Sequence, residues 1–271
     1  MPELPEVETV RRTLVDWCKG KMITDATIFY NKVLIGIDFD DFKNKIVGQK
    51  INDVDRFGKY LFFILDDYVL ISHLRMEGKY FFTNNEDEYI KKHKIISFKL
   101  DDETLIYHDV RKFGKMKLVD KDRYMLDESI SKLGKEPFTI SKEELYNKIH
   151  HLTKKIKQSL LDQSIISGLG NIYVDEVLFD SKISPSRSSN DITLKECEKI
   201  IQSSIKILNK AIELKGSTIA TYHFNNNESG GFQSEHKVYG KKGSKCSICG
   251  NVIEKTTIAG RGTYYCPNCQ K

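Results

Sequence analysis

The sequence has 271 residues, of which 39% are apolar and 30% charged, and its formal net charge is +5. This length suits two domains, or one domain with an appendage, and the composition is that of a globular protein. Glutamates at positions 3, 6 and 8 exclude the apolar stretch of a signal peptide. The longest apolar runs are interrupted by charges within a few residues, so no segment is expected to span a bilayer. A cytoplasmic protein is expected.

The stretch MPELPEVETV predicts a helix from about residue 5 to residue 17, because Leu4, Val7 and Leu14 recur at roughly helical spacing. Proline and acidic residues both suit a first helical turn. The glutamates can therefore be interpreted as an acidic helix start. That interpretation does not explain Pro2, which becomes the N-terminal residue if Met1 is removed.

A second interpretation of the same stretch is chemical. An α-amino group titrates near 8, so more of it is an uncharged nucleophile at neutral pH than is the case for a lysine. The secondary amine of Pro2 would condense with an aldehyde to give a permanently charged iminium, which is an electron sink. Glu3 and Glu6 lie three residues apart on one face, where a carboxyl group could shuttle protons for that amine.

Residues 22–119 contain about eight short runs rich in Val, Ile, Phe and Tyr, separated by Gly, Asn and Asp. This spacing predicts a β-sandwich or barrel. After residue 120 the pattern becomes helical, with capping boxes that begin at Ser141 and Thr193. The second of these helices is predicted to stop at residues 215–216. Residues 216–234 are rich in Gly, Ser and Asn, which predicts a mobile loop or linker.

The cysteines predict a metal site. Four of the six form two CxxC pairs with sixteen residues between the pairs, which in a cytoplasmic chain indicates zinc rather than disulfides. Four thiolates leave no open position, so the zinc is structural, and residues 240–271 are too few to fold without it. No organic cofactor is expected, and the other two cysteines are predicted to be small buried apolar residues. The predicted ligands are Cys246, Cys249, Cys266 and Cys269.

Two features near the C-terminal half predict phosphate contacts. Residues 235–271 contain seven Lys or Arg and two acidic residues, which leaves a positive patch even after zinc binding. Gly260 and Gly262 flank Arg261 at a predicted hairpin turn, where the guanidinium could grip a phosphate or simply be solvated. The glycines of SGLG precede Asn171, a predicted helix N-cap, and would leave helix N–H groups exposed as an anion site.

The segments HLRMEGKY and HDVRKFG each place a cation near an apolar residue, His73 near Met76 and Arg111 near Phe113. Side chains of this kind can wedge into a duplex and stack against unpaired bases. The alternative is a strand-end arginine and a core phenylalanine. On the same terms, Lys59 in RFGKYLF would be an ordinary lysine beside a strand.

Together these segments resemble one family, in the same order from residue 2 to residue 271. MPELPEVETVRR, GKYLFF, HLRMEG, HDVRKFG, the LDQ…SGLGNIYVDEVLF block and GRGTYYCPNCQK are similar to bacterial formamidopyrimidine-DNA glycosylase. The resemblance implies an α+β multidomain fold with DNA in a cleft. Its implied parts are an N-terminal helix plus β-sandwich (1–120), a helix–two-turn–helix domain (121–220), and a linker with a C-terminal four-cysteine zinc finger (221–271).

The resemblance also implies a reaction on double-stranded DNA that contains oxidised purines or abasic sites, carried out by a monomer with one structural zinc. Pro2 would attack C1′ of a damaged purine nucleotide and expel 8-oxoguanine or a formamidopyrimidine. The Schiff base would then drive β- and δ-elimination, with Glu3 as proton donor, Glu6 nearby and Lys59 assisting near the phosphate. Arg261 would bind phosphate and take part in δ-elimination.

The remaining residues implied by the resemblance are DNA contacts. Met76, Arg111 and Phe113 would fill the gap after the damaged nucleotide flips out, with Arg111 pairing with the orphaned cytosine. The full implied set of DNA contacts is His73, Met76, His93, Arg111, Phe113, Lys154 and Asn171.

Two departures from the family pattern stand out. Lys112 occupies a position where many members have a second arginine, which would alter a phosphate contact rather than the wedge. The sequence KGST replaces a common double glycine at the loop that the family closes over the flipped base, and this affects the detail of lesion gating.

Three alternative functions stay open. An endonuclease VIII-like relative would share the fold and Pro2 but prefer oxidised pyrimidines, and the wedge residues argue against it. A DNA- or lesion-binding protein without catalysis would use the zinc finger and basic cleft alone, and the presence of Pro2, Glu3 and Lys59 argues against it. A proline-amine tautomerase would give the zinc finger and the helical domain no role.

Overall fold

The computed structural model describes residues 1–217 and 230–271. Most of the loop predicted at 216–234 therefore lies outside the described residues. The rest forms two compact units, one made of Met1–Pro2 with Glu6–Ser131 and the other of Glu3–Pro5 with Lys132–Ser217 and Gly230–Lys271. Within the described ranges, no helix has both the length and the apolar character needed to cross a bilayer.

The first unit is a β-sandwich with a helix against its core. Its two antiparallel four-stranded sheets have the strand orders β1-β6-β7-β5 and β2-β3-β4-β8. Apolar side chains from both sheets meet in one buried cluster, to which Val7, Val10 and Leu14 of the N-terminal helix also belong. The strands are β1 (Ile23–Ile28), β2 (Asp53–Phe57), β3 (Tyr60–Ile64), β4 (Tyr68–His73), β5 (Lys79–Phe82), β6 (Lys94–Leu100), β7 (Glu103–His108) and β8 (Lys115–Asp120).

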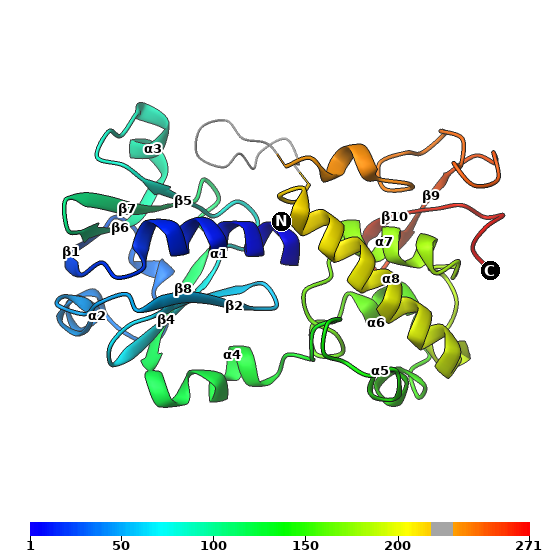
Figure 1. Cartoon of the computed structure of the whole chain (residues 1–271), viewed down its shortest axis with the longest axis horizontal. Helices are drawn as coiled ribbons and strands as arrows, with labels where there is room; N and C mark the ends of the chain where they lie inside the picture. The colour runs from blue at the N-terminus through cyan, green and yellow to red at the C-terminus, as the bar shows by residue number, and fades with distance from the viewer. Residues whose placement is uncertain (218–229) are drawn as a thin grey trace. The chain divides into compact units, whose positions relative to one another are not determined.

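The helix that the first ten residues predict is confirmed as α1, Leu4–Cys18. In the view of Figure 1, α1 runs between the two sheets, with β6 and β7 above it and β4 and β8 below. The predicted sandwich is also confirmed, because the two sheets contribute apolar side chains to one buried cluster. The other α-helices described in this unit are α2 (Phe39–Ile46), α3 (Glu88–His93) and α4 (Glu128–Ser131).

Two loops of the first unit connect one sheet to the other. Residues 74–78 lead from β4 to β5, and residues 109–114 lead from β7 to β8. These are the two segments that contain the predicted wedge residues. The fold therefore places both segments at crossings between sheets rather than inside strands.

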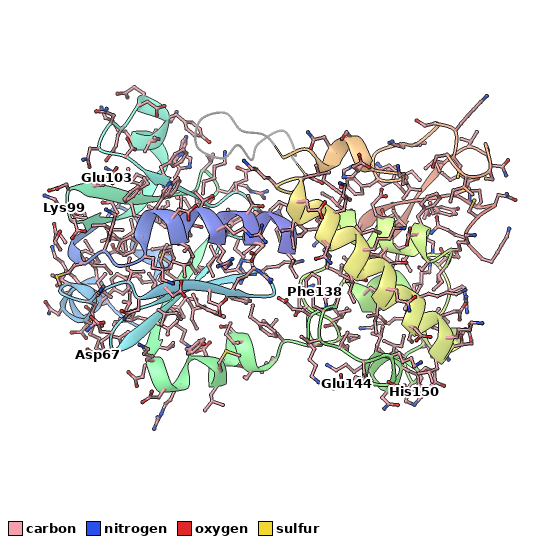
Figure 2. The ribbon with its side chains drawn as sticks, viewed as in Figure 1. Asp67, Lys99, Glu103, Phe138, Glu144 and His150 are labelled. Atoms are coloured by element: carbon pink, nitrogen blue, oxygen red, sulfur yellow. The ribbon has the colours of Figure 1, made fainter. Side chains whose placement is uncertain are left out.

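The second unit begins with four helices, α5 (Lys142–Ile149), α6 (Ile156–Leu160), α7 (Asn171–Asp180) and α8 (Leu194–Glu213). Both predicted capping boxes are confirmed, and in each the N-cap hydroxyl and the N3 glutamate bond reciprocally. Figure 2 labels one of these glutamates, Glu144, at the start of α5, and His150 at its end. The helical core includes Leu4 from the beginning of the chain.

The second unit ends in a hairpin of β9 (Glu254–Ile258) and β10 (Arg261–Tyr265). The predicted turn was wrong by about one residue. The two residues between the strands are Ala259 and Gly260, both with positive φ, as a two-residue hairpin of this kind requires. Gly262 lies within β10, and Arg261 is the exposed first residue of that strand. Cys18 and Cys197 are fully buried, as predicted.

Candidate active site and nucleic-acid interface

The N-terminus of α7 holds the carboxylate of Glu3. The backbone N–H of Ile172 donates to Glu3 Oε1 at 3.0 Å, and that of Tyr173 donates to Oε2 at 3.4 Å. A carboxylate at this place also interacts favourably with the positive end of the helix dipole. The sequence predicted an anion site here for an external ligand. The structure shows that the anion at these N–H groups is the chain's own Glu3.

The glycines of SGLG are required by this arrangement. A Cβ at Gly170 would lie 2.3 Å from Cδ of Glu3, and a Cβ at Gly168 would lie 2.5 Å from Cδ1 of Leu4. Gly168 also has φ +97°, and its carbonyl accepts the N–H of Leu4 at 3.1 Å. The segment Glu3–Pro5 is therefore docked onto the helical unit by backbone contacts that only glycine allows.

Asn171 is the first residue of α7 and not its N-cap, which is Gly170. The predicted cap was therefore wrong. Asn171 Nδ2 instead donates to the carbonyl oxygen of Gly262 at 3.1 Å, across to the β9–β10 hairpin. Its Oδ1 is buried and has no hydrogen-bond partner among the described residues.

A buried ion pair behind Asn171 holds the same hairpin. Lys157 and Asp175 lie 2.7 Å apart with no exposed side-chain surface. Lys157 Nζ also donates to the Gly262 carbonyl at 3.1 Å, and Asp175 Oδ2 accepts the N–H of Tyr264 at 2.9 Å. Burial raises the pKa of Asp175 to about 7, against the opposing effect of the Lys157 ammonium. Arg261, one residue before Gly262, is thus carried on a hairpin that is fixed at several points.

Glu176, the next residue of α7, holds the segment that leads to the zinc finger. Its carboxylate accepts the backbone N–H groups of Lys237, Val238 and Tyr239 at 2.8–3.0 Å. Burial raises its pKa, although these N–H groups oppose the shift. Neither Asp175 nor Glu176 was predicted to have a role. The available signal was an Asp-Glu dipeptide in the middle of an otherwise apolar helix, where buried charges need partners.

The four predicted zinc ligands lie together. Their sulfur atoms are all within 4.8 Å of one another, and two of the Sγ–Sγ distances are 3.5 and 3.8 Å. Tetrahedral zinc with Zn–S bonds of about 2.3 Å requires thiolates roughly 3.8 Å apart, so the cluster fits one closed four-cysteine zinc. The chain end is tied to the helical core as well, since Gln270 Nε2 donates to the Ile183 carbonyl at 2.9 Å.

Pro2 and Glu6 lie near the start of α1 and are buried. Pro2 directly precedes Glu3 in the chain, so the contacts that anchor Glu3 also restrain Pro2. Glu8, the third glutamate of this stretch, forms ion pairs with three arginines. Glu8 binds Arg11 at 2.9 Å, Arg12 at 2.8 Å and Arg56 at 3.1 Å.

Glu8 supports the hairpin turn that contains Lys59, and it does so through Arg56. Arg56 Nη1 donates to the Gly58 carbonyl at 3.1 Å while its Nε donates to Glu8. Gly58 and Lys59 form the two-residue turn between β2 and β3, and Gly58 has φ +58°. Burial tends to raise the pKa of Glu8, but the three arginine contacts lower it to about 2. Lys59 itself is 5% exposed, which is unusual for a lysine beside a strand.

His73, at the end of β4, is a neutral hydrogen-bond donor. Burial and the nearby cations Arg75 and Lys59 lower its pKa to about 3. Its Nδ1 accepts the backbone N–H of Arg75 at 2.9 Å, so Nε2 carries the proton. At neutral pH this side chain can donate one hydrogen bond to a phosphate but adds no positive charge.

The loop 109–114 is shaped by the buried carboxylate of Asp109, which the sequence analysis did not single out. Its oxygens accept the backbone N–H groups of Arg111, Phe113 and Gly114 at 2.8–2.9 Å. Arg111 and Phe113 are exposed, and the guanidinium lies 4.8 Å from the Phe113 ring centre. A core position for Phe113 is excluded, because half of its surface is accessible.

Two further predicted contacts have other partners. His93 is half-buried at the end of α3, where its ring packs against Tyr89 and His108. Lys154 lies in the second unit, where its Nζ binds Asp162 at 2.9 Å. Met76 is partly exposed in the loop 74–78.

Three family models match the chain in succession. Residues 1–116 match the formamidopyrimidine-DNA glycosylase N-terminal domain, and residues 133–223 match the H2TH domain of the same family. Residues 243–271 match a zinc finger found in FPG and IleRS.

Full-length relatives give the same result. The formamidopyrimidine-DNA glycosylases of Bacillus cereus and Halalkalibacterium halodurans are each 46% identical to this chain. Both alignments cover 100% of this chain, and they cover 99% of the Bacillus cereus protein and 100% of the Halalkalibacterium halodurans protein. The Lactococcus lactis Fpg in complex with DNA containing an abasic site superposes with a TM-score of 0.91 at 42% identity. A MutM in complex with DNA containing carbocyclic 8-oxo-G gives 0.90 at 42% identity. Both comparisons cover 100% of each chain.

Proposed function

Because the chain belongs to the formamidopyrimidine-DNA glycosylase family, we propose that it excises oxidised purines from double-stranded DNA and cleaves the resulting abasic site by β,δ-elimination. Its substrates are 8-oxoguanine, formamidopyrimidines and abasic sites. The observation that carries this proposal is the position of the Glu3 carboxylate. Two backbone N–H groups of α7 hold this carboxylate, and Glu3 directly follows Pro2 in the chain.

Pro2 is the nucleophile of the proposed reaction. Once Met1 is removed, its nitrogen bonds to C1′ of the damaged nucleotide as the bond from C1′ to the base breaks, and the sugar ring opens to an iminium. A base removes a C2′ proton, and the electrons of that C–H bond flow into the iminium and expel the 3′ phosphate. Loss of a C4′ proton to a base then expels the 5′ phosphate in the same way. Hydrolysis of the last iminium frees Pro2. A secondary amine suits each step, because its iminium needs no extra proton to stay charged.

Glu3 exchanges protons with the sugar and the departing groups in this proposal. Both of its oxygens are oriented by backbone N–H donors of α7. A carboxyl group held in this way approaches the reacting atoms in one geometry. Such positioning lowers the activation barrier of proton transfer. Glu6 is the second buried acid of the proposed centre, and Lys59 assists at the phosphate next to the lesion.

The proposed DNA contacts come from several separate segments of the chain. Arg261 binds a phosphate and takes part in δ-elimination, while Asn171 and His73 donate neutral hydrogen bonds to the backbone. Met76, Arg111 and Phe113 fill the space left by the flipped nucleotide, with Arg111 pairing to the orphaned cytosine. His93 and Lys154 are outer contacts, and Lys154 would exchange Asp162 for a phosphate. The four cysteines hold one structural zinc.

The proposal includes a monomer that acts in the bacterial cytoplasm. It also includes domain boundaries at 120/121 and 220/221, with the zinc finger as a separate domain.

Borohydride trapping tests the proposal. A duplex with one 8-oxoguanine opposite cytosine is incubated with wild type and with Pro2→Gly, which keeps an N-terminal amine but not a secondary one. We expect a covalent adduct and a nick with phosphate at both ends for wild type, and a sharp loss for the variant. Trapping only on oxidised pyrimidines would instead support the endonuclease VIII-like alternative. Tight binding with no adduct on either duplex would mean a lesion-binding protein without catalysis.

A further inference from the structure

Tyr107 and Tyr173 are the largest fully buried side chains of the described structure, and Tyr107 lies near the end of β7, two residues before the loop 109–114. Its ring packs on that of Tyr80 with centroids 5.1 Å apart. In the sheet, the two residues are direct partners between β5 and β7. The loop 74–78 ends immediately before β5, so Tyr107 is adjacent to both of these loops.

The hydroxyl group of Tyr107 occupies the space beside two glycines. A Cβ at Gly78 would lie 2.1 Å from Tyr107 Oη, and a Cβ at Gly114 would lie 1.7 Å from the same atom. Neither glycine has positive φ, so backbone conformation does not require glycine at these positions. At Gly114 the requirement comes from the close approach of the backbone to this phenol, and at Gly78 it comes from the phenol together with the Leu74 carbonyl oxygen, 2.7 Å from the same Cβ.

Each glycine closes one of the two loops. The N–H of Gly78 donates to the Leu74 carbonyl at 2.9 Å, which closes the turn that contains Met76. The N–H of Gly114 donates to Asp109 at 2.8 Å and closes the turn that contains Arg111 and Phe113. A single rigid ring thus separates the ends of the two turns.

We propose that Tyr107 is a positioning residue that sets the spacing between Met76 and the Arg111–Phe113 loop, and so determines how the gap opposite the orphaned base is filled. This inference rests on the proposed function. The three wedge residues come from two loops that are far apart in the sequence, and they must enter one gap together. Packing against a side chain in a close-packed core fixes such a spacing better than solvent-exposed loop contacts can.

The structure supplies a matched pair of variants. Tyr107→Phe removes only the hydroxyl that lies against Gly78 and Gly114. Tyr80→Phe removes a hydroxyl from the neighbouring buried ring, where it forms a 2.7 Å hydrogen bond with Ser72 instead. Both changes remove one oxygen from the same core, and Tyr80→Phe also leaves the buried Ser72 hydroxyl without this partner, so it is a demanding control for loss of stability.

The experiment measures single-turnover excision of 8-oxoguanine opposite cytosine and opposite adenine. It also measures the fluorescence of a 2-aminopurine placed beside the lesion, which reports the loss of stacking when the wedge enters. For Tyr107→Phe we expect the ratio of the two excision rates to fall at least threefold and the fluorescence change to be reduced. Tyr80→Phe should keep both at the wild-type level. A general loss of stability would not change the rate ratio.

Equal rate ratios and fluorescence changes in the two variants would overturn the inference. A coupling measurement provides a second test if Tyr107→Phe is poorly folded. Gly114→Ala should reduce the excision rate less in the Tyr107→Phe background than in wild type, because the Tyr107 hydroxyl, the closest atom to the new Cβ, is then gone. Strictly additive effects of the two substitutions would contradict the proposal. If wild type forms no borohydride adduct on any lesion, the proposed function itself fails, which is a distinct result.

Discussion

Lys157 and Asp175 form an ion pair that is closed to solvent, with 2.7 Å between Nζ and Oδ1 and no exposed surface on either side chain. Each also binds the backbone of β10, through Gly262 and Tyr264. The pair therefore joins α6, α7 and the hairpin of the zinc finger at one point. A buried pair of this kind is costly to break but not always stabilising compared with apolar residues.

We expect Lys157→Met and Asp175→Leu each to lower the free energy of unfolding by about 3–5 kcal/mol, because each leaves a buried charge without its partner. The double variant Lys157→Met with Asp175→Leu should recover most of that loss while DNA affinity stays low, since the contacts to Gly262 and Tyr264 are not restored. Chemical denaturation and a DNA titration of the three variants measure this. Additive losses in the double variant would show that the two residues act independently.

Gly170→Ala should abolish catalysis without unfolding the protein. Gly170 has an extended backbone that alanine can adopt, but its Cβ would lie 2.5 Å from Glu3 Oε1 and displace the carboxylate. We expect excision to fall by about 100-fold or more, as misplacement of a reacting group by about 1 Å does. Gly231→Ala is the control, because its Cβ would meet nothing closer than 3.7 Å. Equal excision rates for the two variants would contradict the role of Glu3.

Removal of zinc should abolish DNA binding. The core around the finger is a small cluster in which Cys246 and Cys266 are themselves members, so little holds it together without the metal. Chelation followed by a DNA titration and metal analysis tests this. Cys249→Ser should have the same effect, whereas Cys197→Ala, at a buried cysteine of α8, should not. Full affinity in metal-free protein would refute the prediction.

Arg261→Ala should weaken DNA binding and reduce the slope of log K against log salt by about one unit, since one phosphate contact is lost. Arg261 is exposed at the start of β10. Arg123→Ala is a suitable control, because it removes an exposed arginine that the proposal does not place on DNA. An unchanged slope for Arg261→Ala would mean that this arginine is only a solvated residue beside the turn.

Glu8→Gln should destabilise the first unit in a pH-dependent way. Burial tends to raise the pKa of Glu8, but Arg11, Arg12 and Arg56 lower it to about 2, below its value in the unfolded chain. The carboxylate therefore contributes stability above about pH 4.5 that is lost as the pH falls towards 2. We expect a loss of about 2–3 kcal/mol at pH 7 that disappears at pH 2.

The control for this pH experiment is Asp25→Asn. Asp25 pairs with Lys43 on the surface, where both side chains are 40–49% exposed, and such pairs contribute little. Unfolding is followed by denaturant titration between pH 7 and pH 2. A constant difference between Glu8→Gln and wild type across this range would contradict the assignment.

Periodicity and spacing determined much of the fold. The helix at Leu4–Cys18, seven of the eight strands of the sandwich and both capping boxes follow from short-range patterns that the structure confirms. The apolar run at residues 33–39 was wrongly predicted as a strand, and β2, which is rich in charged residues, was missed. The zinc ligands also follow from local spacing, because a CxxC turn brings two thiols to one metal whatever surrounds it. The family could be recognised for the same reason, since its motifs are contiguous.

Contacts between distant segments decided the rest. The glycines at 168 and 170 indicated an anion site, but only the fold shows that Glu3 is the anion. In the same way, Asp175 looked like one more residue of an apolar helix until Lys157 was placed against it. Side chains that serve a distant partner leave no periodic signal in the sequence, because the partner is chosen by the packing of whole helices and sheets and not by the neighbours along the chain.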